Sequence, residues 1–373
     1  MNSGDYKKYV WQQVEWPQWA FDSARLSTLL SQVNVERGRL LGSMQALGFK
    51  LSEQASLKVL TSEIVKSSEI EGEKLNPEAV RSSIASRLGV SDSNPVKSDK
   101  NTDGVVEMVL DATLNYQEPL TEARLFGWHA ALFPTGYSGM HKINVATYRV
   151  DVDGPMQVVS GGIGREKVHY EAPAADVLSA QMSEFLAWLN STADCDPVLK
   201  SGLAHLWFVT LHPFEDGNGR IGRALCDLTL SRADESSQRF YSLSSQMMKE
   251  RNDYYNALEH AQKSSLDATA WLEWYLGCML RAVLSANEEI KGTLYFTSLS
   301  MRAKGGSFNP RQMHMMNMLM HSFEGKLTTG KWAALAKCST DTALRDIEAL
   351  VELGAFKMMG TSRRDSYYVP TWM

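Results

Sequence analysis

Apolar residues recur three and four positions apart along most of the chain, as in DVLSAQMSEFLAWLN (176–190) and DATAWLEWYLGCMLRAVLSA (267–286). This spacing places the apolar side chains on one face of a helix. One stretch alternates instead: YRVDVDGPMQVVS, GGIG and REKVHYEAP predict a β-hairpin at about 148–173. The pattern therefore predicts an all-α fold with an isolated hairpin, which must lean on the helices or on something it binds.

Two interruptions of the helical pattern divide the chain. The polar, Pro-bearing stretch SDSNPVKSDKNTD at 91–103 is typical of a linker or loop. Near residue 290 the helical pattern gives way to TSLSMRAKGGSFNP and a basic region. We therefore expect three parts, at 1–92, 104–290 and 291–373. The last has 11 Lys and Arg against 6 Asp and Glu, a net charge of +5 that leaves −10 for residues 1–290, so we expect different partners for the two.

Composition narrows the class of protein. Of the 373 residues, 44% are hydrophobic and 22% are charged, which is ordinary for a globular protein. The sequence contains no run of 18 consecutive apolar residues, so no membrane helix is predicted. The first residues lack the apolar core of a signal peptide. We expect a cytoplasmic protein without membrane contact. The cysteines form no CxxC pair, so buried thiols are expected at Cys195, Cys226, Cys278 and Cys338.

The segment HPFEDGNGR (212–220) concentrates groups that bind anions and move protons. DPVLKSGLAHLWFVTL predicts a preceding helix, capped by Asp196 and begun by Pro197, and IGRALCDLTLSRA predicts a following one. A Gly-Asn-Gly loop that leads into a helix N-terminus forms an anion-binding nest. Suitable side chains surround it: Arg220 and Arg223 for phosphate oxygens, Asp216 for Mg²⁺ and His212 as general base. These residues predict a nucleotidyl or phosphoryl transferase.

Two other interpretations of this segment are disfavoured. GNGRIG matches the glycine pattern of dinucleotide-binding folds, but Gly217 comes six residues after Leu211, whereas that pattern begins almost at the end of a strand. A hydrolytic metal site built from His205, His212 and Asp216 would take two ligands from one helix, with no evident third. His205, within the apolar run GLAHLWF, is expected to be a core histidine.

HPFEDGNGRIGR (212–223) resembles the Fic family signature, H-x-F-x-D/E-G-N-G-R-x-x-R, at every fixed position. The resemblance implies an all-α Fic-type core that transfers AMP from ATP, with Mg²⁺, to a Ser, Thr or Tyr hydroxyl of a target protein. It implies that His212 is the base and Asp216 the Mg²⁺ ligand. The nucleotide-binding residues that it implies are Phe214 as buried loop anchor, Gly217, Asn218, Gly219 and Arg220 around the phosphates, Arg223 at the γ-phosphate, and Tyr255 and Gln262 on the adenine side.

The resemblance extends to the hairpin and to an upstream helix. The hairpin is similar to the flap that clamps a target segment by strand-like pairing, with target contacts at Val158, Val159, Ser160, Gly161 and Gly162. SSEIEGEKL (67–75) resembles the inhibitory motif S/T-x-x-x-E-G/N, with Ser67, Glu71 and Gly72 at the fixed positions.

The residues around this motif are consistent with an inhibitory role. Gly72 can end the helix that carries Ser67 and Glu71 one turn apart, and Asn76-Pro77 can start the next. In proteins with this motif the glutamate pairs with the second arginine, here Arg223, and displaces the γ-phosphate. Glu73 is the alternative if the register differs.

The basic tail, GKWAALAKCSTDTALRDIEALVELGAFKMMGTSRRDSYYVP (330–370), has its own pattern. It predicts two short helices around a turn at 338–340, a stop at Gly354, and two strands around Gly360, Arg363 and Arg364. This order resembles a winged helix. DNA and protein are both candidate partners of residues 291–373, and Arg345 is the clear outward basic residue of the second helix.

We therefore expect a self-restrained cytoplasmic protein adenylyltransferase. One alternative is a DNA-binding regulator that keeps the Fic core as a nucleotide sensor, but sensing does not require the base His212. Another is a Fic enzyme that uses a different donor or mainly removes AMP from its target. Self-AMPylation and a homodimer are compatible with the same residues.

Overall fold

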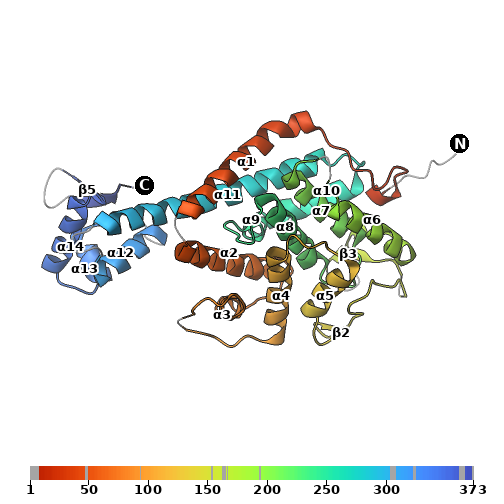
Figure 1. The fold of residues 1–373 in the computed structure, drawn as a ribbon, viewed down its shortest axis with the longest axis horizontal. Coiled ribbons are helices and arrows are strands. Elements are labelled where there is room, and N and C mark those ends of the chain that lie inside the picture. The colour runs from red at the N-terminus through yellow and green to blue at the C-terminus, as the bar shows by residue number, and fades with distance from the viewer. Residues whose placement is uncertain are drawn as a thin grey trace. The chain divides into compact units, whose positions relative to one another are not determined.

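The structure is a computed structural model. It describes residues 8–46, 49–92, 94–152, 154–161, 165, 167–192, 195–302, 308–321, 325–360 and 366–371. These residues form fourteen α-helices and three two-stranded antiparallel sheets (Figure 1). The mainly helical fold that the sequence predicts is therefore confirmed. The chain divides into two compact units, Met1–Ser285 and Ala286–Met373.

The first unit is built from helices around two short hairpins. Its helices are α1 (Ser23–Ala46), α2 (Phe49–Ile70), α3 (Pro77–Leu88), α4 (Lys100–Leu114), α5 (Glu122–Leu132), α6 (Leu178–Asn190), α7 (Pro197–Leu211), α8 (Asn218–Asp234), α9 (Leu243–Lys249) and α10 (Arg251–Lys263), with α11 (Thr269–Arg302) starting here. Its strands are β1 (Tyr137–Ser138), β2 (His141–Lys142), β3 (Gln157–Ser160) and β4 (Lys167–Glu171), and 3₁₀ turns occur at Val10–Gln12 and Ala175–Val177.

Capping side chains set several helix starts. Asn76 accepts a hydrogen bond from the Glu78 N–H at 2.9 Å before Pro77, so α3 begins where the sequence predicts. Asp99 accepts one from the Thr102 N–H at 2.7 Å and thereby starts α4 at Lys100. The predicted linker at 91–103 is thus irregular only as far as Asp99, because a cap lies inside the polar stretch.

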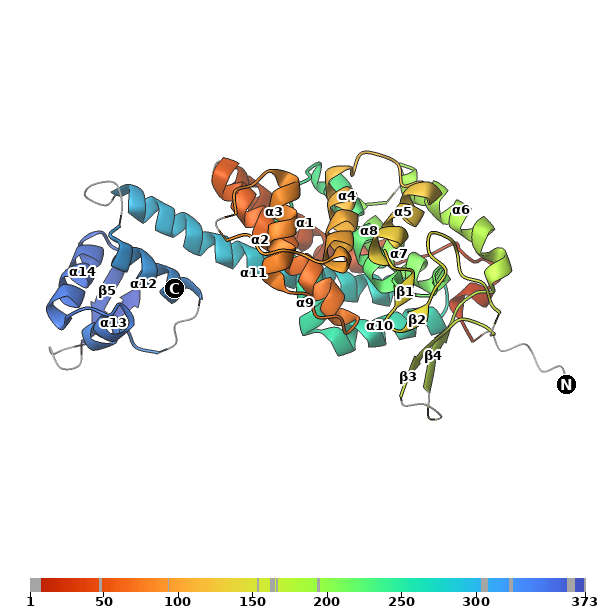
Figure 2. The same cartoon turned by 90° about the horizontal axis from the view of Figure 1, so that it is seen from below.

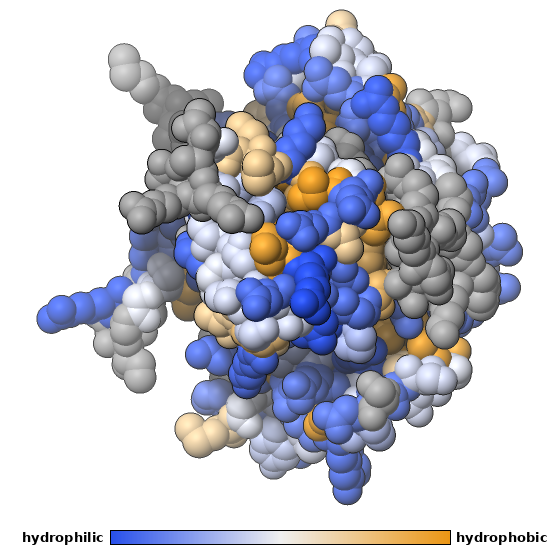
Figure 3. Space-filling model, turned by 90° about the vertical axis from the view of Figure 1, so that its left-hand side faces the viewer, coloured by the Kyte–Doolittle hydropathy of each residue, from blue (hydrophilic) through white to orange (hydrophobic). Residues whose placement is uncertain are grey.

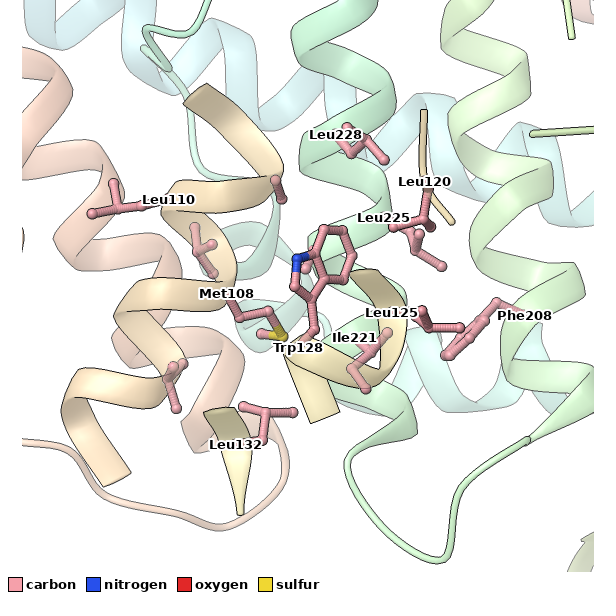
Figure 4. Close-up of a cluster of buried hydrophobic side chains, with 14 of the residues drawn as sticks. Met108, Leu110, Leu120, Leu125, Trp128, Leu132, Phe208, Ile221, Leu225 and Leu228 are labelled. Atoms are coloured by element: carbon pink, nitrogen blue, oxygen red, sulfur yellow. The ribbon is translucent and has the colours of Figure 1, made fainter. Parts of the chain in front are cut away.

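The core of the first unit lies between α4, α5, α7 and α8. Figure 4 shows apolar side chains from these helices converging, with the Trp128 indole near the centre of the cluster. α7 and α8 are buried along nearly their whole lengths. The loop that joins them, residues 212–217, is therefore held by two helices that have little freedom to move.

The predicted hairpin is present but shorter than 148–173. Among the described residues the ladder joins 157–160 to 167–171, with an irregularity between Val158 and Val159, and the Ala172 N–H donates to the Met156 carbonyl at 2.9 Å just beyond it. Residues 150–152 alternate in sequence, yet Val150 and Val152 are exposed, and the Asp151 carboxylate accepts a hydrogen bond from the Ala175 N–H at 2.6 Å. The backbone of residues 150–152 is therefore held by a side-chain hydrogen bond and not by the hydrogen bonds of a β-ladder.

The helical pattern does not end near residue 290. α11 continues to Arg302, past the Thr and Ser residues that suggested a boundary. Thr and Ser disfavour a helix interior only modestly, so they do not by themselves end a helix. The division into residues 1–92, 104–290 and 291–373 stays a prediction.

The second unit has a small core of its own. α12 (Pro310–His321), α13 (Thr329–Leu335) and α14 (Thr340–Glu352) precede an antiparallel pair, β5 (Phe356–Met359) and β6 (Tyr367–Pro370). Trp332, Ile347 and Phe356 are buried in it. The predicted order of helix, turn, helix and two strands is present, and α12 adds a helix that the sequence analysis missed. Identification as a winged helix stays a prediction, and Arg363 and Arg364 lie outside the described residues.

None of the described helices is long and apolar enough to cross a membrane. Figure 3 shows a mostly hydrophilic face with small, separate apolar patches. Of the four thiols, Cys226 and Cys278 are buried as expected, but Cys195 and Cys338 are partly exposed, because they lie in the connections before α7 and α14.

Candidate functional site

The HPFEDGNGR segment is the loop between α7 and α8. α7 starts as predicted, with the Asp196 carboxylate accepting from the Val198 N–H at 2.8 Å and Pro197 in the first turn. It ends at His212, whose φ of 48° lies in the left-handed region. A residue with a Cβ takes this conformation at a cost, so it needs support from its surroundings.

Segments far away in sequence supply that support. The Arg149 guanidinium donates from Nε to the His212 carbonyl at 2.8 Å, and the Arg149 N–H donates to the Pro213 carbonyl at 2.9 Å. The Tyr170 hydroxyl of β4 donates to the Thr210 carbonyl at 2.7 Å. The backbone of His212 is therefore fixed by contacts that no local sequence pattern indicates.

The proton of the His212 ring has a defined position. Nδ1 lies 3.4 Å from the Val209 carbonyl. A carbonyl can only accept, so Nδ1 carries the proton and the Nε2 lone pair is free. Protein atoms packed around the partly buried ring lower the pKa of His212 to about 4, mainly by desolvation. The ring is therefore neutral near pH 7, with Nε2 able to accept a proton.

The loop is stabilised from inside by Asn218 and Phe214. The Asn218 side chain accepts from the Phe214 N–H at 3.0 Å and donates to the Phe214 carbonyl at 2.8 Å. The Phe214 ring is fully buried and stacks on His129 with centroids 4.1 Å apart. Both side chains thus hold the loop, and only the backbone of Asn218 is available to an anion.

His129 is a site residue that sequence analysis missed. Its Nδ1 accepts from the Ala146 N–H at 3.1 Å, so its Nε2 carries the proton and donates to the Asp216 carbonyl at 3.2 Å. Burial lowers the pKa of His129 to about 4 and keeps the ring neutral. It lies on α5, 87 positions before Asp216, and its only sequence signal is a polar residue on an apolar helix face.

The Asp216 carboxylate is oriented by two donors and partly exposed. Oδ1 accepts from the Gly217 N–H at 2.5 Å, and Oδ2 accepts from the Ser138 hydroxyl. The described residues contain no group of three or more His, Cys, Asp or Glu that could hold a metal. One carboxylate is nevertheless enough for Mg²⁺, because this ion completes its shell with substrate phosphates and water. Asp216 therefore fits a nucleotide-bound Mg²⁺.

Arg220 and Arg223 leave α8 as buried cations with carboxylate partners. Arg223 donates from Nε to the Ser67 hydroxyl at 2.8 Å and from Nη2 to Glu71 Oε1 at 2.7 Å. Arg220 donates from Nη1 to Glu73 Oε2 at 2.7 Å. Arg220 Nε and Arg223 Nη1 are buried without a hydrogen-bond partner in the described structure. Unpaired buried donors are costly, so both arginines retain capacity for an anion.

The Glu71 carboxylate occupies the N-terminus of α8. A Cβ built on Gly219 would lie 2.0 Å from Glu71 Oε1, so the carboxylate rests against the first turn of the helix. The first N–H groups of a helix lack intrahelical partners and attract anions. Gly217 is required for another reason, since its φ is 84° and a Cβ would lie 2.9 Å from the Phe133 ring. A carboxylate therefore occupies the place predicted for a phosphate.

Comparison with known proteins shows which families the two main segments of this unit resemble. Residues 119–230 match the model of the Fic/DOC family, and residues 9–90 match a domain of unknown function, DUF4172. The chain contains a Fic/DOC domain. A Fic family protein from Desulfovibrio desulfuricans has a similar structure, with a TM-score of 0.55 at 21% identity over 94% of this chain and 97% of that chain. At this identity the likeness shows the fold.

Relatives of the Fic domain include adenylyltransferases. Protein adenylyltransferase Fic of Culex quinquefasciatus is 29% identical over 168 residues, which cover 43% of this chain and 32% of that protein. Protein adenylyltransferase fic-1 of Caenorhabditis elegans is 42% identical over 55 residues, 14% of this chain and 11% of that protein. The chain thus spans about a third or less of the length of these relatives.

The two residues predicted on the adenine side, Tyr255 and Gln262, lie on α10, beyond the segment that matches the Fic/DOC model. The Tyr255 hydroxyl lies 3.4 Å from the Ile70 carbonyl at the end of α2. Gln262 is buried and donates to the Val209 carbonyl at 3.3 Å, the same carbonyl that orients His212. Their assignment to an adenine pocket stays a prediction.

The hairpin of the Fic domain leans on α10, and the strands β3 and β4 project beyond the helices (Figure 2). Ser160 on β3 contacts His169 on β4 at 2.5 Å, and His169 Nδ1 contacts Glu259 of α10 at 2.7 Å. Val158 and Val159 are exposed, and β3 pairs only with β4 among the described strands. Gly161 has a φ of 109°, and Gly162 lies outside the described residues.

The structure also bears on the two disfavoured interpretations of the motif, a hydrolytic metal site that includes His205 and a dinucleotide-binding fold. His205 is fully buried, contacts the Tyr254 hydroxyl at 2.9 Å and stacks on Trp271. The prediction of a core histidine is confirmed. The described strands form antiparallel pairs without the parallel sheet that dinucleotide binding requires.

Proposed function

We propose that this protein is a protein adenylyltransferase whose activity is restrained by Glu71. A hydroxyl oxygen of a target protein attacks the α-phosphorus of ATP. The bond from that phosphorus to the bridging oxygen breaks, and pyrophosphate leaves. His212 Nε2 takes the hydroxyl proton, because its lone pair is free and the ring is neutral near pH 7.

The phosphates would take the place now held by carboxylates. The first N–H groups of α8 and the free donors Arg220 Nε and Arg223 Nη1 favour a polyphosphate. Asp216 would hold Mg²⁺, which neutralises charge on the phosphates. The observation that carries the proposal is the Glu71 carboxylate lying against Gly219 and on Arg223, since an anion site filled by the chain itself is one that must be vacated for ATP.

The target segment would pair with the outer edge of β3. An unpaired strand edge binds an extended segment through main-chain hydrogen bonds, and Val158 and Val159 are exposed beside it. The alternative of DNA binding finds less support. Besides Arg345, the exposed charged residues of α14 are Asp341, Glu348 and Glu352, so this helix presents a mainly acidic face that repels phosphates.

The test is transfer of label from α-³²P-ATP to protein, with Mg²⁺ and proteins of a cell lysate. Glu71→Gly should increase labelling, and adding His212→Ala should reduce it about 10²- to 10⁴-fold. Glu69→Gln is the matched control, because its carboxylate pairs with Lys66 at 2.6 Å and not with either arginine.

The same reaction with γ-³²P-ATP separates adenylyl transfer from phosphoryl transfer. Label from the α position alone supports the proposal. Label from the γ position would replace it with phosphoryl transfer. Absence of labelling by the Glu71→Gly variant, in a sample that still binds ATP, would contradict it and favour a nucleotide sensor.

A further inference from the structure

The turn after α2 directs two carboxylates, and not one, at α8. In an uninterrupted helix, side chains at 71 and 73 would lie about 200° apart around the axis. Gly72 has a φ of 86°, and the chain folds back so that the Glu71 and Glu73 N–H groups both bond to the Ser68 carbonyl, at 3.1 and 3.0 Å. This reversal brings both side chains to the same helix end.

Each carboxylate has its own arginine. Glu71 pairs with Arg223 and Glu73 with Arg220, each at 2.7 Å. The arginine side chains are 2% and 4% exposed, respectively, whereas those of Glu71 and Glu73 are 32% and 48% exposed. A buried guanidinium needs a counter-charge, and removing it without replacement is strongly unfavourable. In the structure Glu71 of the turn supplies that counter-charge to Arg223. Glu73 supplies it to Arg220, with Asp216 Oδ2 further away at 3.9 Å, and a phosphate could replace the carboxylates of the turn.

We propose that Glu73 is a second internal competitor for the nucleotide, which acts on Arg220 independently of Glu71. The turn 71–73 then imitates two adjacent phosphates, and the ligand class is a nucleoside di- or triphosphate. The inference deepens the proposed function and rests on its nucleotide site. It follows that Glu71→Gly alone leaves part of the restraint in place, because the Glu73 pair with Arg220 remains.

The two competitors should differ in strength and in salt dependence. Glu73 is half exposed, so water and salt screen its pair with Arg220 more than they screen the pair of Glu71. Arg220 extends from the first turn of α8, whereas Arg223 lies about one turn further along. Loss of Glu73 should therefore improve the binding of ADP as well as ATP.

The experiment measures dissociation constants of Mg·ADP and Mg·ATP by calorimetry, in a His212→Ala background that prevents turnover. Glu73→Gln should tighten both nucleotides about threefold to tenfold. It should add a further gain to Glu71→Gly, and the gain from Glu73→Gln should shrink at high KCl. Glu69→Gln, which alters a carboxylate in the last turn of α2 that is paired with Lys66, should leave both constants unchanged.

Unchanged constants for Glu73→Gln, alone and with Glu71→Gly, would overturn the inference. An equal gain from Glu69→Gln would also overturn it, since general charge removal would then explain the effect. Melting temperatures of all variants verify folding, and Glu73→Ala repeats the test with a second side chain. Failure of AMP transfer by the Glu71→Gly variant would refute the proposed function while these binding constants still decide the role of Glu73.

Discussion

The start of α8, together with the loop before it, and the turn after α2 contribute opposite charges to one site, but they are built differently. The loop is fixed by Asn218 inside it and by Arg149 and His129 around it. The turn presents its carboxylates from partly exposed positions. The comparison indicates that the anion site is preformed and that the side chains of the turn are the parts that can yield.

The rest of α2 is attached too firmly to yield with them. Glu63 is buried and accepts from the Ser242 hydroxyl at 2.6 Å and from the Ser244 N–H at 3.0 Å, which joins α2 to α9. Arg251 donates to the Ile70 carbonyl at 2.9 Å. Under the proposed inhibition, we therefore expect relief through a shift of the turn and not through release of the helix.

The largest expected effect on stability comes from removing the side chain that holds the α7–α8 loop. Asn218→Ala leaves the buried N–H and carbonyl of Phe214 without partners, which should lower the free energy of unfolding by about 2–4 kcal/mol. Denaturant unfolding measures this change. Asn144→Ala removes an exposed amide that bonds to Glu215 in the same region and should cost about 0.5 kcal/mol or less. Equal effects would show that the loop does not depend on Asn218.

A smaller effect should follow from straining the turn. Gly72→Ala places a side chain at a φ of 86°, with no atom within 4 Å of the new Cβ, so conformational strain is the only direct cost. The free energy of unfolding should fall by about 1–2 kcal/mol. Gly42→Ala is the control, because its Cβ also meets nothing within 4 Å but its φ is not positive.

That control should leave the protein as stable or more stable, since alanine is the better helix former. Relaxation of the strained turn should also loosen both carboxylates and tighten ATP binding. A variant with unaltered stability would mean that the turn accommodates alanine, and would remove the geometric basis for pairing both glutamates with α8.

The smallest effect concerns pH. Burial lowers the pKa of His212 to about 4, and the base is active when neutral, so activity is lost only as the pH falls through that value. AMP transfer by the Glu71→Gly variant should change less than about twofold between pH 5 and 8. A histidine with an ordinary pKa of about 6.5 would lose about tenfold by pH 5.5. An inflection of the AMP-transfer rate near pH 6.5 would contradict this prediction, because it would show that water reaches His212 as freely as it reaches the exposed turn.

Local patterns predicted the elements that local interactions create. The Asp196-Pro197 start of α7, the Asn76-Pro77 start of α3 and the facing of Ser67 and Glu71 all follow from capping and helical spacing. The hairpin predicted at about 148–173 starts later than alternation suggests, because Asp151 bonds through its side chain to the Ala175 N–H instead of pairing along a strand.

Long-range contacts explain what the sequence could not predict. His129, Arg149 and Ser138 approach the motif only through the packing of α5 and of the segments after it. Glu73 could be treated only as an alternative to Glu71, because helical spacing places these positions on different faces. The conformation of Gly72 removes that choice, and both carboxylates reach α8.

The four thiols differ in burial, so two of them can be labelled selectively with fluorescent dyes. Cys226 and Cys278 are buried, and burial raises the pKa of Cys226 to about 12, so neither should react with a maleimide near neutral pH. Cys195 and Cys338 are partly exposed and lie one in each compact unit. The native chain thus offers a donor and an acceptor site for fluorescence energy transfer between its units, without any engineered cysteine.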